Sequence, residues 1–216
     1  MPKNYPVFLH LRNRACVVIG GGEVATHKVL GLLECAAKVT VISPSVTPAL
    51  RDLAKSGAII HIHRPYSPGD LRGIFLAIAA TNDAEVNRQI AQEAEGARVL
   101  LNVVDVSDLG DFFTPAVVQR GQVTIAISTN GASPALARKL REELSTDPAL
   151  QWADLADLLA KARAELRKKK IKATPERWQQ AITAHLLKLV QAGKSDEALR
   201  EVLTSLTTGA TREVAP

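Results

Sequence analysis

The chain has 216 residues, a length that suits one large domain or two small ones. Hydrophobic residues make up 46% of it and aromatic residues 4%, which is typical of a globular protein with an aliphatic core. No apolar run approaches the ~20 residues that a membrane-spanning helix needs. The N-terminal stretch MPKNYPVFLHLRNR lacks the apolar centre and cleavage site of a signal peptide. The sequence therefore predicts a cytoplasmic protein with no membrane partner.

The net charge of +5 comes from one short segment. Residues 161–172, KARAELRKKKIK, hold seven basic residues and one acid, so the rest of the chain is slightly negative. Such a run is typical of a solvated helix face, an anion site or a nucleic-acid surface. The sequence contains no recognisable nucleic-acid-binding module, and no aromatic residue interrupts the run. We therefore expect no nucleic-acid partner.

The two cysteines, Cys16 and Cys35, are too few for a disulfide framework. Cys16 falls in an expected strand and Cys35 at an expected helix end. Because free cysteines are among the most buried residues, we expect both to be buried thiols.

Short apolar runs alternate with helical patterns up to about residue 104. Several runs lack polar alternation, as expected of strands that are buried on both faces of a parallel sheet. The alternation predicts an α/β fold, with a Rossmann-like, doubly wound parallel sheet. The expected strands are 15–20, 38–42, 58–63, 74–79 and 98–104, and the expected helices are 23–35, 46–56 and 83–95.

The pattern changes in the second half of the chain. Residues 113–129 predict a hairpin of two strands around Arg120-Gly121. Ser133 can cap a following helix that begins at Pro134. Beyond Pro148 the pattern is helical, with one apolar stripe from Leu155 to Leu166. A second helix is expected from Pro175 to just before Gly193, and a third from Ser195 to about Leu206.

The glycines of CVVIGGGEVATHKVL lie between an expected strand and an expected helix. Gly20-x-Gly22-x-x-Ala25 stands in the context that the dinucleotide-binding fingerprint requires. The first glycine permits a tight turn, the second lets the backbone approach a pyrophosphate, and the third position must be small. The helix N-terminus would offer N–H groups and the positive end of its dipole. The alternative is a purely structural turn.

The second expected strand lacks the acidic residue that usually holds the ribose hydroxyls at its end. Ser43, Pro44 and Ser45 follow it, so a serine hydroxyl or a backbone amide would have to take that role. No arginine directly follows the strand, and nothing there favours a 2′-phosphate.

Polar residues also follow the fourth and fifth expected strands. Thr81 and Asn82 end one, and Asn102 and Asp105 lie at the end of the other. Open α/β sheets bind their ligands at the carboxyl ends of the strands, so these residues are candidates for a site. Considered alone, Asp105 fits a turn or helix cap as well as it fits a catalytic role.

Four segments occur in the order and at the spacing of a known family: VVIGGGEVATHKVLGLL, AIAATNDAEVN, NVVD and FFTPAVVQRGQVTIAISTNGASPALARKLREEL. Together they resemble the precorrin-2 dehydrogenase family of sirohaem biosynthesis, some members of which are also sirohydrochlorin ferrochelatases. The resemblance covers about residues 3–145. It departs at His27, Cys35 and Asn130, where the family usually has arginine, glycine and glycine.

The resemblance implies NAD-dependent oxidation of precorrin-2 to sirohydrochlorin, and it leaves open whether Fe²⁺ is then inserted to give sirohaem. It implies a homodimer with an NAD-binding Rossmann domain (1–111), a dimerisation segment (112–146) and a helical C-terminal domain (147–216). It assigns the catalytic aspartate of NVVD to Asp105. The residues that it places near NAD are Gly20, Gly22, Glu23, Val24, Ser43, Pro44, Thr81 and Asn102.

The implied tetrapyrrole substrate carries many carboxylates, so a cationic wall suits it. The basic run 161–172 is one candidate for this wall, and a solvated helix face is the alternative for the same run. The other candidate substrate-binding residues are Ser128, Arg138, Lys139 and Arg141.

We expect no fixed metal site, and Fe²⁺ would enter only as a substrate. His61 and His63 alternate in an expected strand and should point to the same face, but no third ligand is evident. The remaining histidines, His10, His27 and His185, are expected to be structural or surface residues.

Two other classes of function remain open. One is an NAD-sensing regulatory module that turns nothing over. The other is a dehydrogenase of a small substrate, which would need a Lys, His or Tyr acid/base group on the rim of the sheet. We find no such group there.

Overall fold

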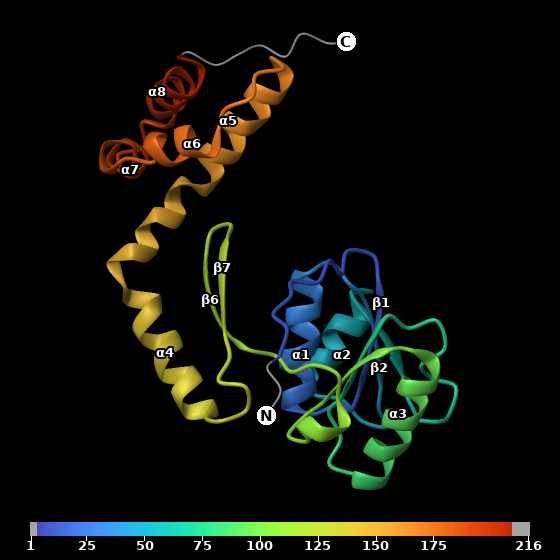
Figure 1. Cartoon of the computed structure of the whole chain (residues 1–216). Coiled ribbons are helices and arrows are strands. Elements are labelled where there is room, and N and C mark those ends of the chain that lie inside the picture. Colours follow the sequence, from blue (N-terminus) through green and yellow to red (C-terminus); the bar gives the residue numbers. More distant parts are fainter. Residues whose placement is uncertain (1–3, 209–216) are drawn as a thin grey trace. The chain divides into compact units, whose positions relative to one another are not determined.

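The computed structural model describes residues 4–208, which form two compact units (Figure 1). The first unit ends at Thr114 and the second begins at Pro115. This boundary lies three residues beyond the end expected for the first domain. The hairpin and the C-terminal helices share the second unit, and their separation into two domains stays a prediction.

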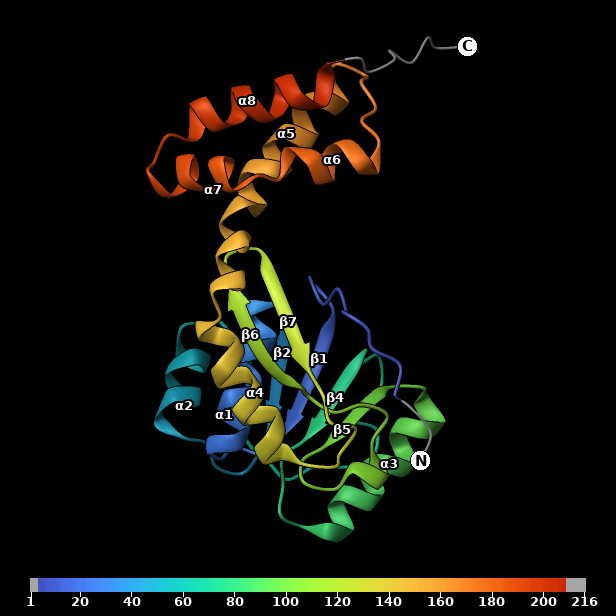
Figure 2. The same cartoon turned by 60° about the vertical axis from the view of Figure 1, so that its left-hand side comes forward.

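The first unit is built on a five-stranded parallel sheet with the strand order β3-β2-β1-β4-β5 (Figure 2). The order reverses between β1 and β4, and such a switch point opens a crevice at the carboxyl ends of the strands. The predicted Rossmann-like fold is therefore confirmed. The strands are β1 (Ala15–Ile19), β2 (Lys38–Ile42), β3 (Ile60–Ile62), β4 (Leu76–Ala79) and β5 (Leu100–Val103).

Helices cover both faces of this sheet. Side chains of β1 alternate between two apolar clusters, with Val18 packed among residues of α1 and α2 and Val17 packed among residues of α3. This two-sided burial explains why the strand sequences lack polar alternation. The helices are α1 (Glu23–Glu34), α2 (Pro48–Lys55) and α3 (Ala84–Ala97).

Strand β5 begins two residues later than the apolar run predicts. Helix α3 continues to Ala97, and Arg98 then takes a left-handed conformation with a φ of 55°. The backbone N–H of Val99 donates to the carbonyl of Ala94 at 2.9 Å, which closes the helix end. Arg98 and Val99 are therefore used in this turn and not in the strand.

The prediction for the cysteines is half right. Cys16 is fully buried in β1, as expected, but Cys35 is exposed. Cys35 is the C-terminal cap of α1, and the next residue, Ala36, has a φ of 56°. The chain turns here at the surface, which leaves the thiol accessible.

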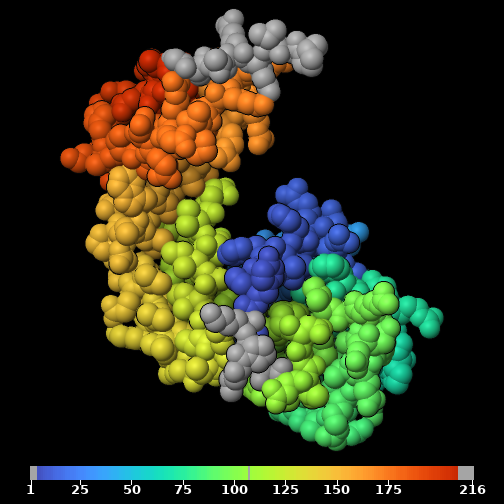
Figure 3. All heavy atoms as spheres, viewed as in Figure 1, coloured from blue at the N-terminus to red at the C-terminus, as the bar shows by residue number. Residues whose placement is uncertain are grey.

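The second unit begins with the predicted hairpin. Strands β6 (Ala116–Arg120) and β7 (Val123–Ile127) pair antiparallel. Helix α4 (Pro134–Thr146) follows, and the Ser133 hydroxyl caps it by accepting from the N–H of Leu136 at 3.1 Å. Figure 3 shows the hairpin and α4 side by side.

The rest of the second unit is a helical cluster around an aliphatic core. Arg120 at the hairpin tip joins it through two hydrogen bonds to the carboxylate of Asp154, at 2.8 and 2.7 Å. The helices are η2 (Pro148–Leu155), α5 (Ala156–Lys168), α6 (Pro175–Ala181), α7 (Ala184–Gln191) and α8 (Ser195–Thr207). Within residues 4–208, none of the helices combines the length and the apolar character needed to cross a membrane.

The prediction of a single helix between Pro175 and Gly193 is wrong, because the chain forms two helices there. Ile182 leaves helical geometry with a ψ of 90°. Thr183 then caps α7 by accepting from the N–H of Leu186 at 3.1 Å. Both helices bury their apolar residues in the same core, so the apolar periodicity of the sequence continues across the break between them.

Candidate functional site

The turn between β1 and α1 requires glycine at two positions for packing. A Cβ on Gly20, whose φ is 124°, would lie 2.2 Å from the carbonyl oxygen of Ala80. A Cβ on Gly21 would lie 1.9 Å from the carbonyl oxygen of Ser45. These glycines let the turn pass close to the β4 and β2 loops. The tight turn therefore depends on neighbouring backbone and not on a ligand.

Gly22 differs from its two neighbours. A Cβ there would meet no atom within 4 Å. Gly22 is the N-terminal cap of α1 and offers no side chain to the helix's first N–H groups. Helix N-termini carry unsatisfied N–H groups and a partial positive charge, which together suit an anion. Gly22 thus leaves open space in front of a helix end that can bind phosphate.

A cavity of about 620 Å³ opens at this helix end. Three segments form its wall: the start of α1, the loop from β4 into α3, and the turn after β5. Its volume is typical of a site for a small molecule or cofactor. The lining residues are Gly22, Glu23, Val24, Ala80, Thr81, Asn82, Ala84, Asn87, Arg88, Val104, Asp105, Val106 and Leu109.

Asp105 lies on this wall in a tight turn after β5. Its φ is 61°, a left-handed conformation that aspartate tolerates better than most residues. The N–H of Val104 still pairs with the sheet, because it donates to the carbonyl of Ala79 at 3.0 Å, and the N–H of Val106 donates to the carbonyl of Val103 at 3.3 Å. The turn therefore projects an exposed carboxylate at the carboxyl end of the sheet.

Lys28 of α1 is a half-buried cation. Its ammonium donates a short hydrogen bond to the hydroxyl of Thr114. Burial lowers the pKa of the Lys28 ammonium, and the charge of Asp105 partly opposes that shift.

The loop from β4 into α3 is fixed by its own side chains. Asp83 caps α3 by accepting from the N–H groups of Glu85 and Val86, at 2.9 and 3.1 Å. Asn87 donates to the carbonyl of Thr81 at 3.1 Å. This network holds Thr81 on the cavity wall.

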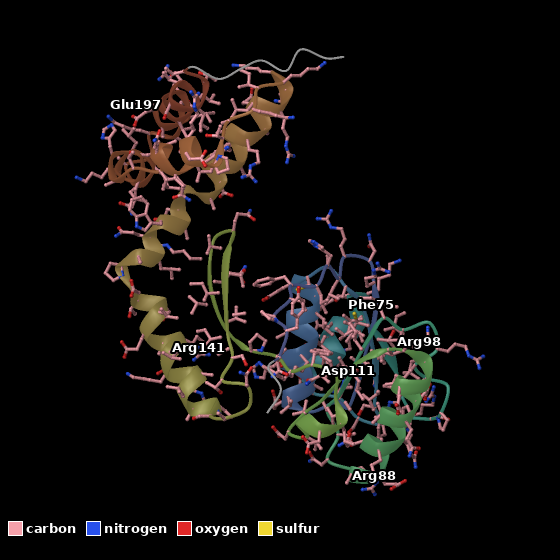
Figure 4. All side chains as sticks on the ribbon, viewed as in Figure 1. Phe75, Arg88, Arg98, Asp111, Arg141 and Glu197 are labelled. Atoms are coloured by element: carbon pink, nitrogen blue, oxygen red, sulfur yellow. The ribbon has the colours of Figure 1, made fainter. Side chains whose placement is uncertain are left out.

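Asn87 and Arg88 line the cavity, and our reading of the sequence missed both. Asn87 is buried, and its Oδ1 has no hydrogen-bond partner among residues 4–208. Arg88 lies in the first half of α3 (Figure 4). It pairs with Glu85 of the same helix. The signal was available, because a helix that follows a central strand begins at the same rim as the strand ends.

Four residues expected near NAD lie outside the lining of this cavity. Gly20 is required for the tight turn between β1 and α1, and Pro44 is exposed on the loop after β2. Ser43 is buried, and its hydroxyl donates to the carbonyl of Ser45 at 2.6 Å. Asn102 is buried and donates to the carbonyl of Phe112 at 2.8 Å. Ser43 and Asn102 therefore hold backbone segments in place.

The cavity residues fit a dinucleotide. The open space at Gly22 and the helix end behind it suit a pyrophosphate. The wall continues from there past Thr81 to Asp105, along the carboxyl ends of β1, β4 and β5. A dinucleotide crosses an open α/β sheet at this edge.

The residues expected to bind the substrate belong to the second unit. Ser128 is exposed after β7, and its hydroxyl accepts from the N–H of Asn130 at 3.0 Å. Arg138, Lys139 and Arg141 are exposed on α4, and Figure 4 shows Arg141 on that helix. Lys139 pairs with Glu143 along the helix. Their role in binding the substrate stays a prediction.

His61 of β3 and His63, which directly follows this strand, lie together, as their alternation predicts. The ring centroids of His61 and His63 are 5.6 Å apart, and Nε2 of His61 lies 3.0 Å from the carbonyl oxygen of Ser43. Among residues 4–208, no three His, Cys, Asp or Glu side chains are grouped so that they could hold a metal ion.

Two family models match the chain. The model described as "Putative NAD(P)-binding" matches residues 7–116, which is about half of the chain. The model described as "Sirohaem biosynthesis protein central" matches residues 120–146, which contain the hairpin turn, β7 and α4. The first match contains every residue of the cavity wall.

Several curated proteins are similar to this chain. A siroheme synthase of Methylobacillus flagellatus is 35% identical over 206 residues, which are 94% of this chain and 44% of that protein. A siroheme synthase of Chromobacterium violaceum is 42% identical over 142 residues, which are 66% of this chain and 30% of that protein. The chain thus spans less than half the length of these relatives.

A solved structure is similar along nearly its whole length. SirC, a precorrin-2 dehydrogenase, superposes with a TM-score of 0.71 at 26% identity, over 92% of this chain and 98% of SirC. The glycine turn, the aspartate after β5 and the segment from the hairpin to α4 all lie within these matches. This chain therefore belongs to the sirohaem-biosynthesis family whose first domain is the NAD(P)-binding domain.

Proposed function

We propose that this chain oxidises precorrin-2 to sirohydrochlorin with NAD, in the pathway to sirohaem. The observation that carries the proposal is the likeness to SirC, which extends over 98% of that precorrin-2 dehydrogenase. The cavity supports it independently, because the phosphate-binding helix end at Gly22 and the carboxylate of Asp105 share one wall. A cytoplasmic location is part of the proposal.

In this proposal the cofactor lies across the carboxyl edge of the sheet. Gly22, Glu23, Val24 and Thr81 contact it from the cavity wall. Gly20, Ser43, Pro44 and Asn102 act through the backbone that they hold or through the adjoining loop.

Bound NAD supplies the acceptor for a hydride. Oxidation of precorrin-2 removes one hydride and one proton from the substrate and forms a new double bond. The carboxylate of Asp105 accepts the proton as a general base. Its exposed place beside the cavity lets water take that proton onward after each turnover.

The substrate's carboxylates need cations. Ser128, Arg138, Lys139 and Arg141 are the candidates on the second unit, where arginine can bind a carboxylate through two hydrogen bonds. Fe²⁺ is a further candidate substrate, because Asp105 could also accept the pyrrole protons that metal insertion displaces. A homodimer, formed by the hairpin and α4, completes the proposal.

One anaerobic assay tests this function against its alternatives. The chain is mixed with NAD and enzymatically made precorrin-2, and NADH and sirohydrochlorin are measured. We expect both products to appear in equal amounts. An NAD-sensing module would bind NAD in calorimetry without forming NADH. A dehydrogenase of small substrates would form NADH with a panel of small alcohols and 2-hydroxy acids but not with precorrin-2.

A second arm of the assay adds Fe²⁺ after sirohydrochlorin has formed. Sirohaem that appears faster than in a protein-free control would establish the chelatase activity. A rate equal to the control would limit the chain to dehydrogenation.

A further inference from the structure

One face of α3 lines the cavity. Ala84, Asn87 and Arg88 are spaced three and four residues apart, so they share one side of the helix, and all three belong to the cavity wall. Ala84 has no polar side-chain atom, and the guanidinium of Arg88 is paired with Glu85. Asn87 differs from both, because it is only 4% exposed and one of its polar atoms has no partner within residues 4–208.

The amide group of Asn87 has a fixed orientation. Its Nδ2 donates to the carbonyl oxygen of Thr81 at 3.1 Å. A carbonyl oxygen can only accept, so a reversed amide would place two acceptors against each other. The hydrogen bond to Thr81 therefore identifies Oδ1 as the unpaired atom, an acceptor without a donor.

A buried acceptor without a donor is rare in native proteins and calls for an explanation. In the part of the chain that the structure describes, Oδ1 of Asn102 and Nη1 of Arg177 are also buried without a partner, but neither residue lines the cavity. At Asn87 the unpaired acceptor and the cavity wall coincide. A ligand in this cavity can therefore supply the donor that the protein does not.

The position of Asn87 selects one half of a dinucleotide bound across this edge of the sheet. The pyrophosphate belongs at the start of α1, which follows the central strand β1, and the adenosine ribose belongs at the end of β2. Strands β4 and β5 lie on the other side of β1, and α3 follows β4. The nicotinamide half therefore belongs on the side of Asn87 and Asp105.

The nicotinamide half carries a group that complements an unpaired acceptor. Its carboxamide N–H2 can only donate, whereas a ribose hydroxyl can also accept and so can pair with donors as well. The carboxylate of Asp105 on the same wall is assigned to the proton, which leaves Oδ1 of Asn87 for the carboxamide. A held carboxamide fixes the rotation of the ring and thus the face that the substrate meets.

We propose that Asn87 is a cofactor-binding residue, whose Oδ1 accepts a hydrogen bond from the carboxamide of NAD while its N–H2 holds the loop at Thr81. This inference rests on the proposed function, because it takes NAD as the ligand of the cavity. The alternative is that Asn87 only holds Thr81 in the loop after β4.

A cofactor analogue separates these two roles without any catalysis. In acetylpyridine adenine dinucleotide a methyl ketone replaces the carboxamide, so the analogue has no N–H to donate at this position. Calorimetry with the wild-type chain should show that the analogue binds about tenfold more weakly than NAD, because it leaves the buried acceptor unpaired. In Asn87→Leu this difference between the two ligands should disappear, since the acceptor is gone.

Asn87→Asp is the matched variant. It loses the hydrogen bond to Thr81, as Asn87→Leu does, but its carboxylate oxygens still accept. It should therefore keep the preference for NAD over the analogue, which a residue that only holds Thr81 would not explain. Asn102→Leu is the control away from the wall, since Asn102 also donates to a backbone carbonyl, and it should change the affinity for both ligands by the same factor.

The outcomes distinguish this inference from the proposed function. A preference for NAD that persists in Asn87→Leu would overturn the role of Asn87 and leave the proposed function intact, and equal binding of both ligands by the wild type would do the same. A wild-type chain that binds neither ligand would contradict the proposed function itself. Circular dichroism verifies that each variant is folded, and Asn87→Ala gives the same comparison if Asn87→Leu is not.

Discussion

The carboxylate of Asp105 is exposed on the cavity wall, and the N-terminal end of α1 at Gly22 lies on the same wall. Neither the backbone of Asp105 nor its side chain supports the sheet core, because β5 ends at Val103. Side chains that contribute little to packing can be replaced without loss of the fold. The single residues of this wall are therefore suitable targets for separating chemistry from binding.

Asp105→Ala should leave the fold and NAD affinity intact. The rate of dehydrogenation should fall by at least ~10²-fold, which is the lower range for losing a general acid/base group. Steady-state kinetics with precorrin-2 measures the loss, and calorimetry with NAD is the control. A loss confined to KM would mean that Asp105 orients the substrate, and a near-normal kcat/KM would remove it from the mechanism.

Gly22→Asp should weaken NAD binding strongly and leave the protein folded, because the new carboxylate enters open space in front of the helix end. Gly21→Ala is the matched variant. Its Cβ would collide with the carbonyl of Ser45, so it should destabilise the fold by about 1–3 kcal/mol, as other overpacked sites do. Calorimetry and thermal melts separate the two effects. Unchanged NAD affinity in Gly22→Asp would contradict the phosphate site.

The two thiols should differ in reactivity. Burial, and to a lesser extent Cys35, raises the pKa of Cys16 from 9.0 to about 11, whereas Cys35 is exposed. Near neutral pH, a thiol reagent should therefore label one cysteine in the native protein and both in denaturant. Two fast equivalents in the native state would contradict the burial of Cys16.

The raised pKa of Cys16 also has a consequence for stability. The unfolded chain loses this proton above about pH 9, while the native protein keeps it until about pH 11. The contribution of Cys16 to stability is therefore complete below pH 9 and is lost as the pH rises toward 11. Denaturant titrations of wild type and Cys16→Ala should differ in slope over this pH window.

At the scale of elements, α5 buries its apolar residues and exposes the lysines at its C-terminal end. Leu158, Ala162 and Leu166 are buried in the core of the second unit, and the lysines at the helix end are exposed. Glu165 forms an ion pair with Lys168 at 2.8 Å. Lys169 is the exposed C-terminal cap of the helix, and Lys170, with a φ of 53°, directs the chain away from the helix. The element thus presents concentrated positive charge without cost to its packing.

Replacing Lys168, Lys169 and Lys170 by glutamine tests whether this charge meets the substrate. The KM for precorrin-2 should rise, because the substrate's carboxylates lose cationic partners, while NAD affinity stays the same. The effect should weaken at high salt, since exposed charges are screened. Unchanged kinetics would show that this end of α5 is an ordinary solvated surface.

At the scale of the molecule, the hairpin and α4 bury little of their own apolar surface. Only Val118 and Ala137 are buried among the residues of β6, β7 and α4. Val117, Leu136 and Leu140 are 43%, 51% and 40% exposed. Exposed apolar residues that gather on one segment mark an interaction surface, and pairing of two chains would also cover the edges of the two-stranded hairpin.

Leu136→Asp combined with Leu140→Asp should therefore convert a dimer into a monomer in sedimentation experiments, because charges in an apolar interface lose their hydration. Ile60→Asp is the control, since Ile60 is 65% exposed, more than either leucine, but lies on β3 of the first unit. Circular dichroism would verify that each variant is folded. A wild-type chain that stays monomeric at micromolar concentration would contradict the proposed homodimer.

Much of the fold could be predicted from local patterns. The five strands, the hairpin turn at Gly121 and the cap at Ser133 all occur where the sequence indicates them. These features depend on residues that are close together in the chain: residue types that form turns, and continuous apolar runs typical of strands buried on both faces. Both can be read from the sequence directly. The break at Thr183 was missed, because both helices that it separates pack on one core and keep one periodicity.

The sequence by itself determined the order of strands and helices, the glycine turn before α1, and the polar residues that follow β4 and β5. Only the tertiary structure decided which of these residues share a wall. Thr81 and Asp105 meet Gly22 there, while Ser43 and Asn102 are buried and hold backbone instead. The physical reason is that a side chain's partners depend on how distant segments pack, and spacing along the chain does not record that packing.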